Sequence, residues 1–438
     1  MLISTLIFIG LLSIFVYSCL WKKEYGLQVI IFTIPISSTY VPLSGYWQSF
    51  PISLTGILVV FFYILTFSRR NFKWHNSYFK CLFYILLFNL VWGMIFTFFY
   101  SDDVVRLSNY WGDTQTQLGL LKPAFQVIYH SSNLVICILF LNILRKYFQV
   151  QKNIENAAYV FSLSIFLMFS TQLLEIFGIR EIRPVYPDDP SYMGLFSMFG
   201  FGIYIAMVIA FSLLFKFSHY RIIIITAFLY GLFSCERQAI ILPVTVLFIY
   251  FLLSSGNILK KVTLILIFGT SLYFLLYVFK TEFHGVVKLW DAINMSKETS
   301  LLEATDRGIN DFILKKLQQA VIEWPITGKG LYNWGYFIGI DTEFANHVIW
   351  INYYQKFGLF GILIFITAIF YFTFVLIKFY ILRKNDRNLV IGLGLMIAFI
   401  GQQFLDNFFW FTNTMLLYIF MFSFIFSVMH KNKTDSSS

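Results

Sequence analysis

A histidine stands at the head of a long apolar run in the last quarter of the sequence. At about 100° per residue, a helix through this run places Tyr354, Gly358 and Gly361 on one face. His347 shares that face. Glycines three residues apart let a neighbouring helix approach closely, which would hold the histidine rigidly at the head of the helix. There it can act as a general base, and the alternative is a structural histidine that caps the helix or meets lipid headgroups.

Three arginines are candidates for binding an anion. Arg237 follows Glu236 at the start of an apolar run, so it either pairs with that carboxylate or binds a phosphate through its planar guanidinium group. Arg183 and Arg307 lie in polar segments between apolar runs, where a solvated loop charge is the alternative.

The acidic residues give weaker signals. Asp188 and Asp189 suggest a metal site, but the prolines around them favour a rigid turn. Asp406 and Glu175 lie near the ends of apolar runs and could relay protons in a transporter, although that position makes the interpretation weak. We therefore expect no bound metal and no other cofactor.

Composition sets the class of protein that must position these residues. The chain is 58% hydrophobic and 12% charged, and apolar runs long enough to cross a membrane recur from end to end. The sequence predicts an all-α, polytopic integral membrane protein. Its net charge of +10 does not indicate nucleic-acid binding, because the basic residues form short clusters between the apolar runs, as the positive-inside rule requires.

The runs predict 13 transmembrane helices, within a range of 12 to 14. Basic connections alternate with connections that lack such clusters, which places the N-terminus outside and the C-terminus in the cytoplasm. The second and eighth spans are short or polar enough to be re-entrant. The predicted spans are 2–20, 26–41, 51–67, 79–100, 123–144, 155–178, 191–215, 222–234, 239–254, 262–279, 348–377, 389–404 and 413–429.

The predicted organisation has four parts. Residues 1–279 hold the first ten spans, 280–346 form one large extracytoplasmic loop, 347–430 hold the last spans and 431–438 form a cytoplasmic tail. The large loop carries 16 of the 54 charged residues. Within it a capping box, apolar residues at helical spacing and then Pro325 predict an amphipathic helix of about five turns.

Three local patterns resemble the O-antigen polymerase and O-antigen ligase superfamily. The first is a histidine followed after ten residues by Gly-x-x-Gly, as in His347, Gly358 and Gly361, although Val348 stands where the family pattern has a polar residue and Asn346 precedes the histidine instead. The second is Arg-x-x-x-Leu, approximated from Arg237 to Ile241. The third is an arginine, an amphipathic helix, a proline and Gly-x-Gly: Arg307, Pro325 and Gly328-Lys329-Gly330.

The resemblance implies an activity, a substrate and a location. The enzyme would be a metal-independent glycosyltransferase of the bacterial inner membrane, with its active site on the extracytoplasmic face. It would join undecaprenyl-diphosphate-linked oligosaccharide repeat units into a surface polysaccharide and release the diphosphate carrier. His347, Arg237 and Arg307 would be catalytic, and Arg183, Tyr354, Asn346 and Lys329 would bind substrate. Expected partners are membrane lipids, a flippase and a chain-length regulator.

Two other functions stay open. An O-antigen ligase would use the same donor and pass the glycan to a lipid A core or another acceptor. A flippase or other transporter belongs to a different class, but transporters of this length concentrate polar residues within their spans and often show repeated halves. The predicted spans of this chain contain few polar residues, and one large loop carries 16 of its 54 charged residues. We favour the polymerase.

Overall fold

The structure is a computed structural model that describes part of the 438-residue chain. The described residues are 2–35, 53–66, 76–100, 123–176, 201–217, 219–233, 238–254, 256–278, 290, 326–331, 349–383, 386–405 and 412–431. They form thirteen helices, and no strand occurs among them. The helices are α1 (Leu2–Trp21), α2 (Lys23–Thr33), α3 (Leu54–Thr66), α4 (Ser77–Phe99), α6 (Pro123–Tyr147), α7 (Gln151–Ile176), α8 (Phe201–Phe215), α9 (Tyr220–Phe233), α10 (Gln238–Leu253), α11 (Ile258–Val278), α15 (Ile349–Leu382), α16 (Arg387–Leu405) and α17 (Thr412–Lys431).

The all-helical class predicted from the sequence is confirmed for these residues, and each predicted span overlaps one helix. Within the described ranges two stretches, Ser77–Phe99 and Tyr353–Leu382, are long and apolar enough to cross a membrane, judged by length and composition alone. Five shorter apolar helices accompany them: Ile9–Trp21, Leu54–Thr66, Gly202–Phe215, Ala239–Leu253 and Thr414–Met429. Helix α2, with 11 residues, is shorter than the roughly 20 residues that a spanning helix needs.

Small polar residues mark where several helices begin. Asn76 has an extended backbone, and its side chain accepts a hydrogen bond of 2.9 Å from the N–H of Tyr78, the second residue of α4. Asn257 and Asp386 accept in the same way before α11 and α16. Such caps satisfy N–H groups that have no partner inside the helix.

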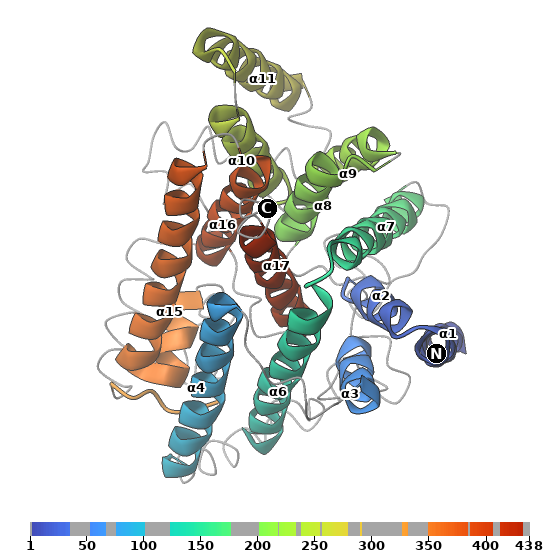
Figure 1. Ribbon diagram of the computed structural model, residues 1–438, viewed down its shortest axis with the longest axis vertical. Helices are drawn as coiled ribbons and strands as arrows, with labels where there is room; N and C mark the ends of the chain where they lie inside the picture. Colours follow the sequence, from blue (N-terminus) through green and yellow to red (C-terminus); the bar gives the residue numbers. More distant parts are fainter. Residues whose placement is uncertain are drawn as a thin grey trace.

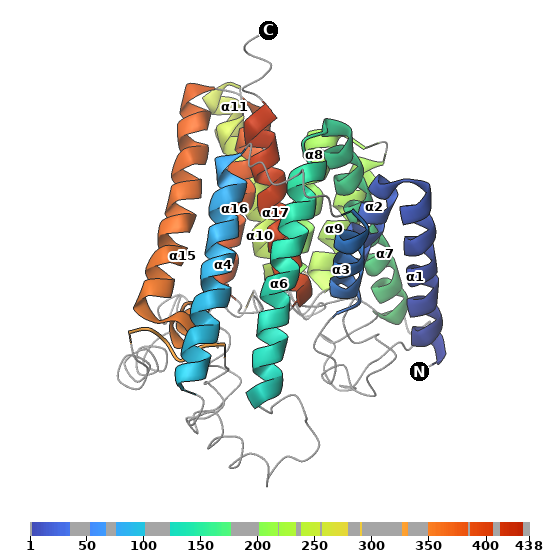
Figure 2. The same cartoon turned by 60° about the horizontal axis from the view of Figure 1, so that its bottom comes forward.

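Contacts between helix ends fix how the helices run relative to one another. The Asn76 amide, before α4, donates to the carbonyl of Phe426 near the end of α17 at 3.3 Å, so α4 is antiparallel to α17. The Tyr380 hydroxyl, near the end of α15, donates to the carbonyl of Leu253 at the end of α10 at 3.0 Å, so these two helices run in the same direction. The long helices stand side by side in Figure 2.

Helix α17 forms the centre of the bundle. Every residue from 414 to 427 is buried, so this helix is enclosed on all sides, as expected for a helix that is apolar all round. Phe420 packs on Phe161 of α7 and Phe424 on Phe211 of α8, with ring centroids 5.3 and 4.6 Å apart. In Figure 1 the other helices surround α17, and α11, which packs against α10, lies at the edge.

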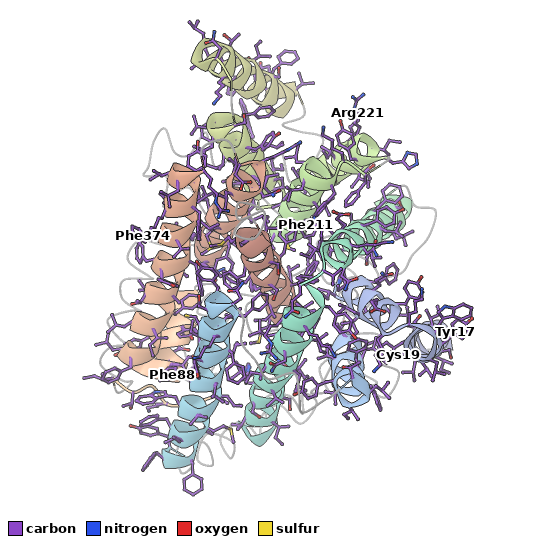
Figure 3. All side chains as sticks on the ribbon, viewed as in Figure 1. Tyr17, Cys19, Phe88, Phe211, Arg221 and Phe374 are labelled. Atoms are coloured by element: carbon purple, nitrogen blue, oxygen red, sulfur yellow. The ribbon has the colours of Figure 1, made fainter. Side chains whose placement is uncertain are left out.

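The outer surfaces of the surrounding helices are apolar. Phe374 of α15 and Tyr17 of α1 point away from the bundle, whereas Phe211 points into it (Figure 3). Large apolar side chains are thus found on both the inside and the outside of the described helices.

Candidate functional site

Helix α15 is interrupted at Gly358. This residue has φ 65° and ψ −164°, outside the helical region, so α15 consists of two helical pieces joined by a kink. We call residues 349–357 the short arm of α15. A break of this kind leaves carbonyl groups before it and N–H groups after it without their helical partners. In an apolar environment these groups need other hydrogen-bond partners, because an unpaired backbone N–H or carbonyl group raises the free energy of the folded state.

Residues 326–331, which we call the docked segment, supply these partners. The segment belongs to the loop that the sequence predicted to be extracytoplasmic, and it lies at the foot of α15 and α4 in Figure 2. Three backbone hydrogen bonds join it to the break, two donated by the segment and one accepted by it: Lys329 N to Gln355 O (2.9 Å), Gly330 N to Lys356 O (3.0 Å) and Leu359 N to Ile326 O (2.6 Å).

Helix α4 holds the other side of the docked segment. The indole N–H of Trp92 donates to the carbonyl of Thr327 at 2.9 Å. The N–H of Leu331 donates to the hydroxyl oxygen of Thr97 at 2.7 Å, and that hydroxyl donates to the carbonyl of Gly93 at 2.7 Å. The segment is therefore clamped between α4 and the broken turn of α15.

Two glycines make this close approach possible. Gly358 and Gly330 have positive φ angles of 65° and 91°, which side chains disfavour. A Cβ atom at Gly358 would strike the carbonyl of Ile326, and one at Gly330 would strike Thr97. The Gly-x-Gly and Gly-x-x-Gly patterns found in the sequence therefore meet at one backbone junction, where each needs a residue without a side chain.

The side chain of Lys329 lies at the rim of this junction. Its backbone is held by two hydrogen bonds to the short arm, from its own N–H to the carbonyl of Gln355 and from the N–H of Gly330 to the carbonyl of Lys356. Its ammonium nitrogen lies 5.6 Å from the centroid of the Tyr100 ring, close enough for a cation–π interaction. Lys329 is only partly buried, so a cationic group is presented beside the end of α4.

A second set of polar groups lies inside the bundle, close to the junction. Lys356 of the short arm is fully buried, and its Nζ lies 3.0 Å from Nε2 of His130 on α6. His130 is 5% exposed, and Asn133, one turn further along α6, is fully buried. When the Lys356 amino group is protonated it can only donate hydrogen bonds, so Nε2 of His130 must then accept one from it.

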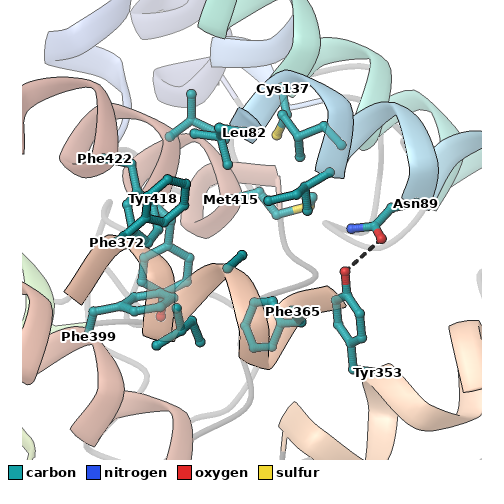
Figure 4. Close-up of a pocket in the computed structure, with 15 residues that line it drawn as sticks. Leu82, Asn89, Cys137, Tyr353, Phe365, Phe372, Phe399, Met415, Tyr418 and Phe422 are labelled. Atoms are coloured by element: carbon teal, nitrogen blue, oxygen red, sulfur yellow. Dashed lines mark hydrogen bonds between the residues drawn. The ribbon is translucent and has the colours of Figure 1, made fainter. Parts of the chain in front are cut away.

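Tyr353 provides a third link from the short arm. Its hydroxyl donates to Oδ1 of Asn89 on α4 at 2.6 Å (Figure 4). Beside this bond is a cavity of about 50 Å³ between α4, α6, α15, α16 and α17, lined mainly by apolar side chains such as Leu86, Phe365 and Met415. It is too small for a sugar, and its walls offer few polar partners to a water molecule.

Sequence reasoning missed Lys356, His130, Asn89 and Asn133. A signal was present, because each lies inside a predicted span, and ionisable or amide groups within a span usually have a structural or functional reason.

Of the predicted site residues, the structure describes two. Tyr354 is 7% exposed and immediately precedes Gln355, whose carbonyl accepts from Lys329. The structure thus brings Lys329 and the backbone beside Tyr354 together. The other predicted residues lie outside the described part of the chain: His347, Arg237, Arg307, Arg183 and Asn346.

One prediction about the geometry is wrong. A single helix face from His347 to Gly361 requires an unbroken helix, and Gly358 breaks it. The glycines also do not admit a neighbouring helix as predicted, because Gly358 faces the docked segment and a Cβ at Gly361 would meet Phe357 of its own helix. A glycine that opens a turn and a glycine that allows helix packing look the same in a sequence.

No model of a known protein family matches the chain, and no curated protein matches it either. Within the described ranges no group of three or more His, Cys, Asp or Glu side chains could hold a metal ion, and Asp188 and Asp189 lie outside those ranges.

Proposed function

We propose that this chain is a polytopic protein of the bacterial cytoplasmic membrane. The outward surface of the described helices supports this, because Leu20, Phe98 and Phe370 are 82%, 82% and 70% exposed and many other large apolar side chains join them. Water would disfavour so much apolar surface, whereas lipid tails match it.

A basic cluster suggests which end of the bundle would face the cytoplasm. Arg383 follows α15 and Arg387 is the first residue of α16, and the Arg387 guanidinium lies over the ring of Tyr250 near the end of α10. The same end of the bundle holds the start of α4 and the end of α17. The positive-inside rule would direct this end to the cytoplasm, and the docked segment to the other side.

We further propose that the protein polymerises oligosaccharide repeat units carried on a polyprenyl diphosphate. The observation that carries this proposal is the junction of the docked segment with the short arm of α15. It unites two of the three sequence patterns on which the resemblance rests, because the Gly-x-Gly of the segment contacts the Gly-x-x-Gly of α15. His347 lies two residues before Ile349, where the described part of the short arm begins.

The proposed reaction needs a base and cations, and no metal. A hydroxyl oxygen of the incoming lipid-linked unit attacks the anomeric carbon of the growing glycan, and the bond from that carbon to the diphosphate oxygen breaks. His347 takes the hydroxyl proton, and the diphosphate leaves on its lipid carrier. Arg237 and Arg307 hold its negative charge, with Arg183 and Lys329 beside them. What supports a role for Lys329 is its fixed backbone and its ammonium group at the rim of the junction.

The test is polymerisation by the purified protein in lipid vesicles that contain only a lipid-linked repeat unit. We expect a ladder of longer glycans and release of the diphosphate carrier. Vesicles without protein, and vesicles with the His347→Ala variant, are the controls. Transfer that occurs only after a lipid A core is added would identify a ligase. Movement of the lipid-linked unit across the bilayer without any new glycosidic bond would identify a transporter.

A further inference from the structure

We propose that Lys356 and His130 are positioning residues, which hold the short arm of α15 in one orientation. The effect on catalysis rests on the function proposed above, whereas the mechanical role of the pair does not. Neither residue is assigned to the substrate.

Three polar links hold the short arm from three directions. The Lys356 ammonium reaches α6 through His130, and the Tyr353 hydroxyl reaches α4 through Asn89. The carbonyl groups of Gln355 and Lys356 reach the docked segment. These links come from the end of the arm that adjoins the kink.

The arm needs such links because it cannot maintain its structure and orientation alone. Its described part has nine residues, and an isolated helix of that length is marginal because the cost of its first turn is barely recovered. The kink at Gly358 also removes the stiffness that a continuous helix would lend it. Apolar contacts keep the arm buried without fixing its rotation, since they are not directional. Hydrogen bonds between buried groups have a direction and are costly to break.

The length of the arm makes small rotations matter. At about 1.5 Å per residue, a rotation of about 10° at the kink moves the tip of the described arm, at Ile349, by about 2 Å. Misplacing a reacting group by about 1 Å can cost roughly 100-fold in rate. His347 precedes that tip, so the proton acceptor of the proposed reaction would move with the arm.

The first test measures the mechanical role without any assay of activity. A cysteine replaces Thr327 in the docked segment of a cysteine-free protein, and its rate of reaction with a soluble thiol reagent is followed. We expect Lys356→Met to raise this rate roughly tenfold, about the effect of losing one buried hydrogen bond. The matched control is Lys378→Met, which removes an exposed lysine from the other end of α15 and should leave the rate unchanged.

The histidine supplies a second pair of variants, which keeps the test decisive if Lys356→Met fails to fold. His130→Gln places an amide oxygen near the position of Nε2 and should react at nearly the rate of the parent protein. His130→Leu offers no acceptor and should react as fast as Lys356→Met. Equal rates for the glutamine and leucine variants, both at the parent value, would overturn the proposal.

The second test concerns catalysis. For Lys356→Met and His130→Leu we expect kcat to fall about 10- to 100-fold, with the KM for the donor changed by less than about threefold, because the pair orients the arm and does not bind the diphosphate. His130→Gln should restore most of kcat. A rise in KM at constant kcat would contradict a positioning role. Altered thiol reactivity in the variants of a parent protein that makes no polymer would leave the mechanical role standing and remove the proposed function.

Discussion

The backbone N–H of Gly330 and the carbonyl of Lys356 form a hydrogen bond of 3.0 Å across a turn of α15 that Gly358 holds open. This bond replaces one that a continuous helix would have made within itself. A segment of the large loop and the short arm of α15 therefore complete each other, and a change in either should be felt in both.

Replacing Gly358 should damage the junction more than replacing a glycine elsewhere. Gly358→Ala puts a Cβ against the carbonyl of Ile326 at a positive φ angle. We expect a loss of about 1–3 kcal/mol in the free energy of unfolding. Gly269→Ala in α11, where a Cβ would meet nothing within 4 Å, is the control and should be neutral or slightly stabilising. Thermal unfolding in detergent measures both, and equal midpoints would contradict the strain argued here.

The Thr97 hydroxyl should stabilise the protein because its oxygen accepts a hydrogen bond from the docked segment. Thr97→Val keeps the shape but leaves the N–H of Leu331 without its acceptor, which should cost about 1–3 kcal/mol. Thr97→Ser keeps the hydroxyl and should lose less. The comparison is made by the same unfolding measurement. A valine variant as stable as the serine variant would show that another group satisfies this N–H.

The predicted orientation in the membrane can be tested with two single cysteines in a cysteine-free background. A cysteine at Glu298 should react with an impermeant thiol reagent in intact cells, because residues 280–346 are predicted to face outside. A cysteine at Ser437 should react only after the cells are opened. The reverse pattern would place the proposed site on the wrong side of the membrane.

Activity should survive chelation of divalent metals. The proposed site meets the charge of the leaving diphosphate with arginine and lysine side chains, which need no ion. Polymerisation in the vesicle assay should therefore proceed in EDTA at nearly the same rate. If EDTA abolished activity and Mg²⁺ or Mn²⁺ restored it, Asp188 and Asp189 would become candidates for metal ligands.

Substitutions of His347 and Arg237 should reduce activity in different ways. His347→Ala should lower the rate of chain growth roughly 10²- to 10⁴-fold with donor binding largely intact, as expected for loss of a placed proton acceptor. Arg237→Lys keeps the charge but loses the two-pronged geometry, so it should weaken donor binding and turnover together. Donor affinity and polymer length, at matched expression, separate the two. Normal polymer from His347→Ala would reduce that residue to a structural role.

The sequence predicted the helices well because each depends on its own residues. An apolar run such as the one in α4 forms a helix wherever water is excluded, and its composition is visible without knowledge of its neighbours. The break at Gly358 depends instead on the docked segment, which approaches from another part of the chain. The pairing of Lys356 with His130 depends on how α15 packs beside α6. Neither relationship leaves a periodic pattern in the sequence.

The buried position of α17 has a consequence for how the protein is made. A ribosome synthesises α17 after the twelve other described helices, yet Phe161, Phe211 and Phe372 pack their rings against it. Until α17 arrives, the earlier helices can assemble only around an unfilled centre. Arrival of this late helix is therefore the event that completes the interior, and the earlier helices must wait for it without settling into another arrangement.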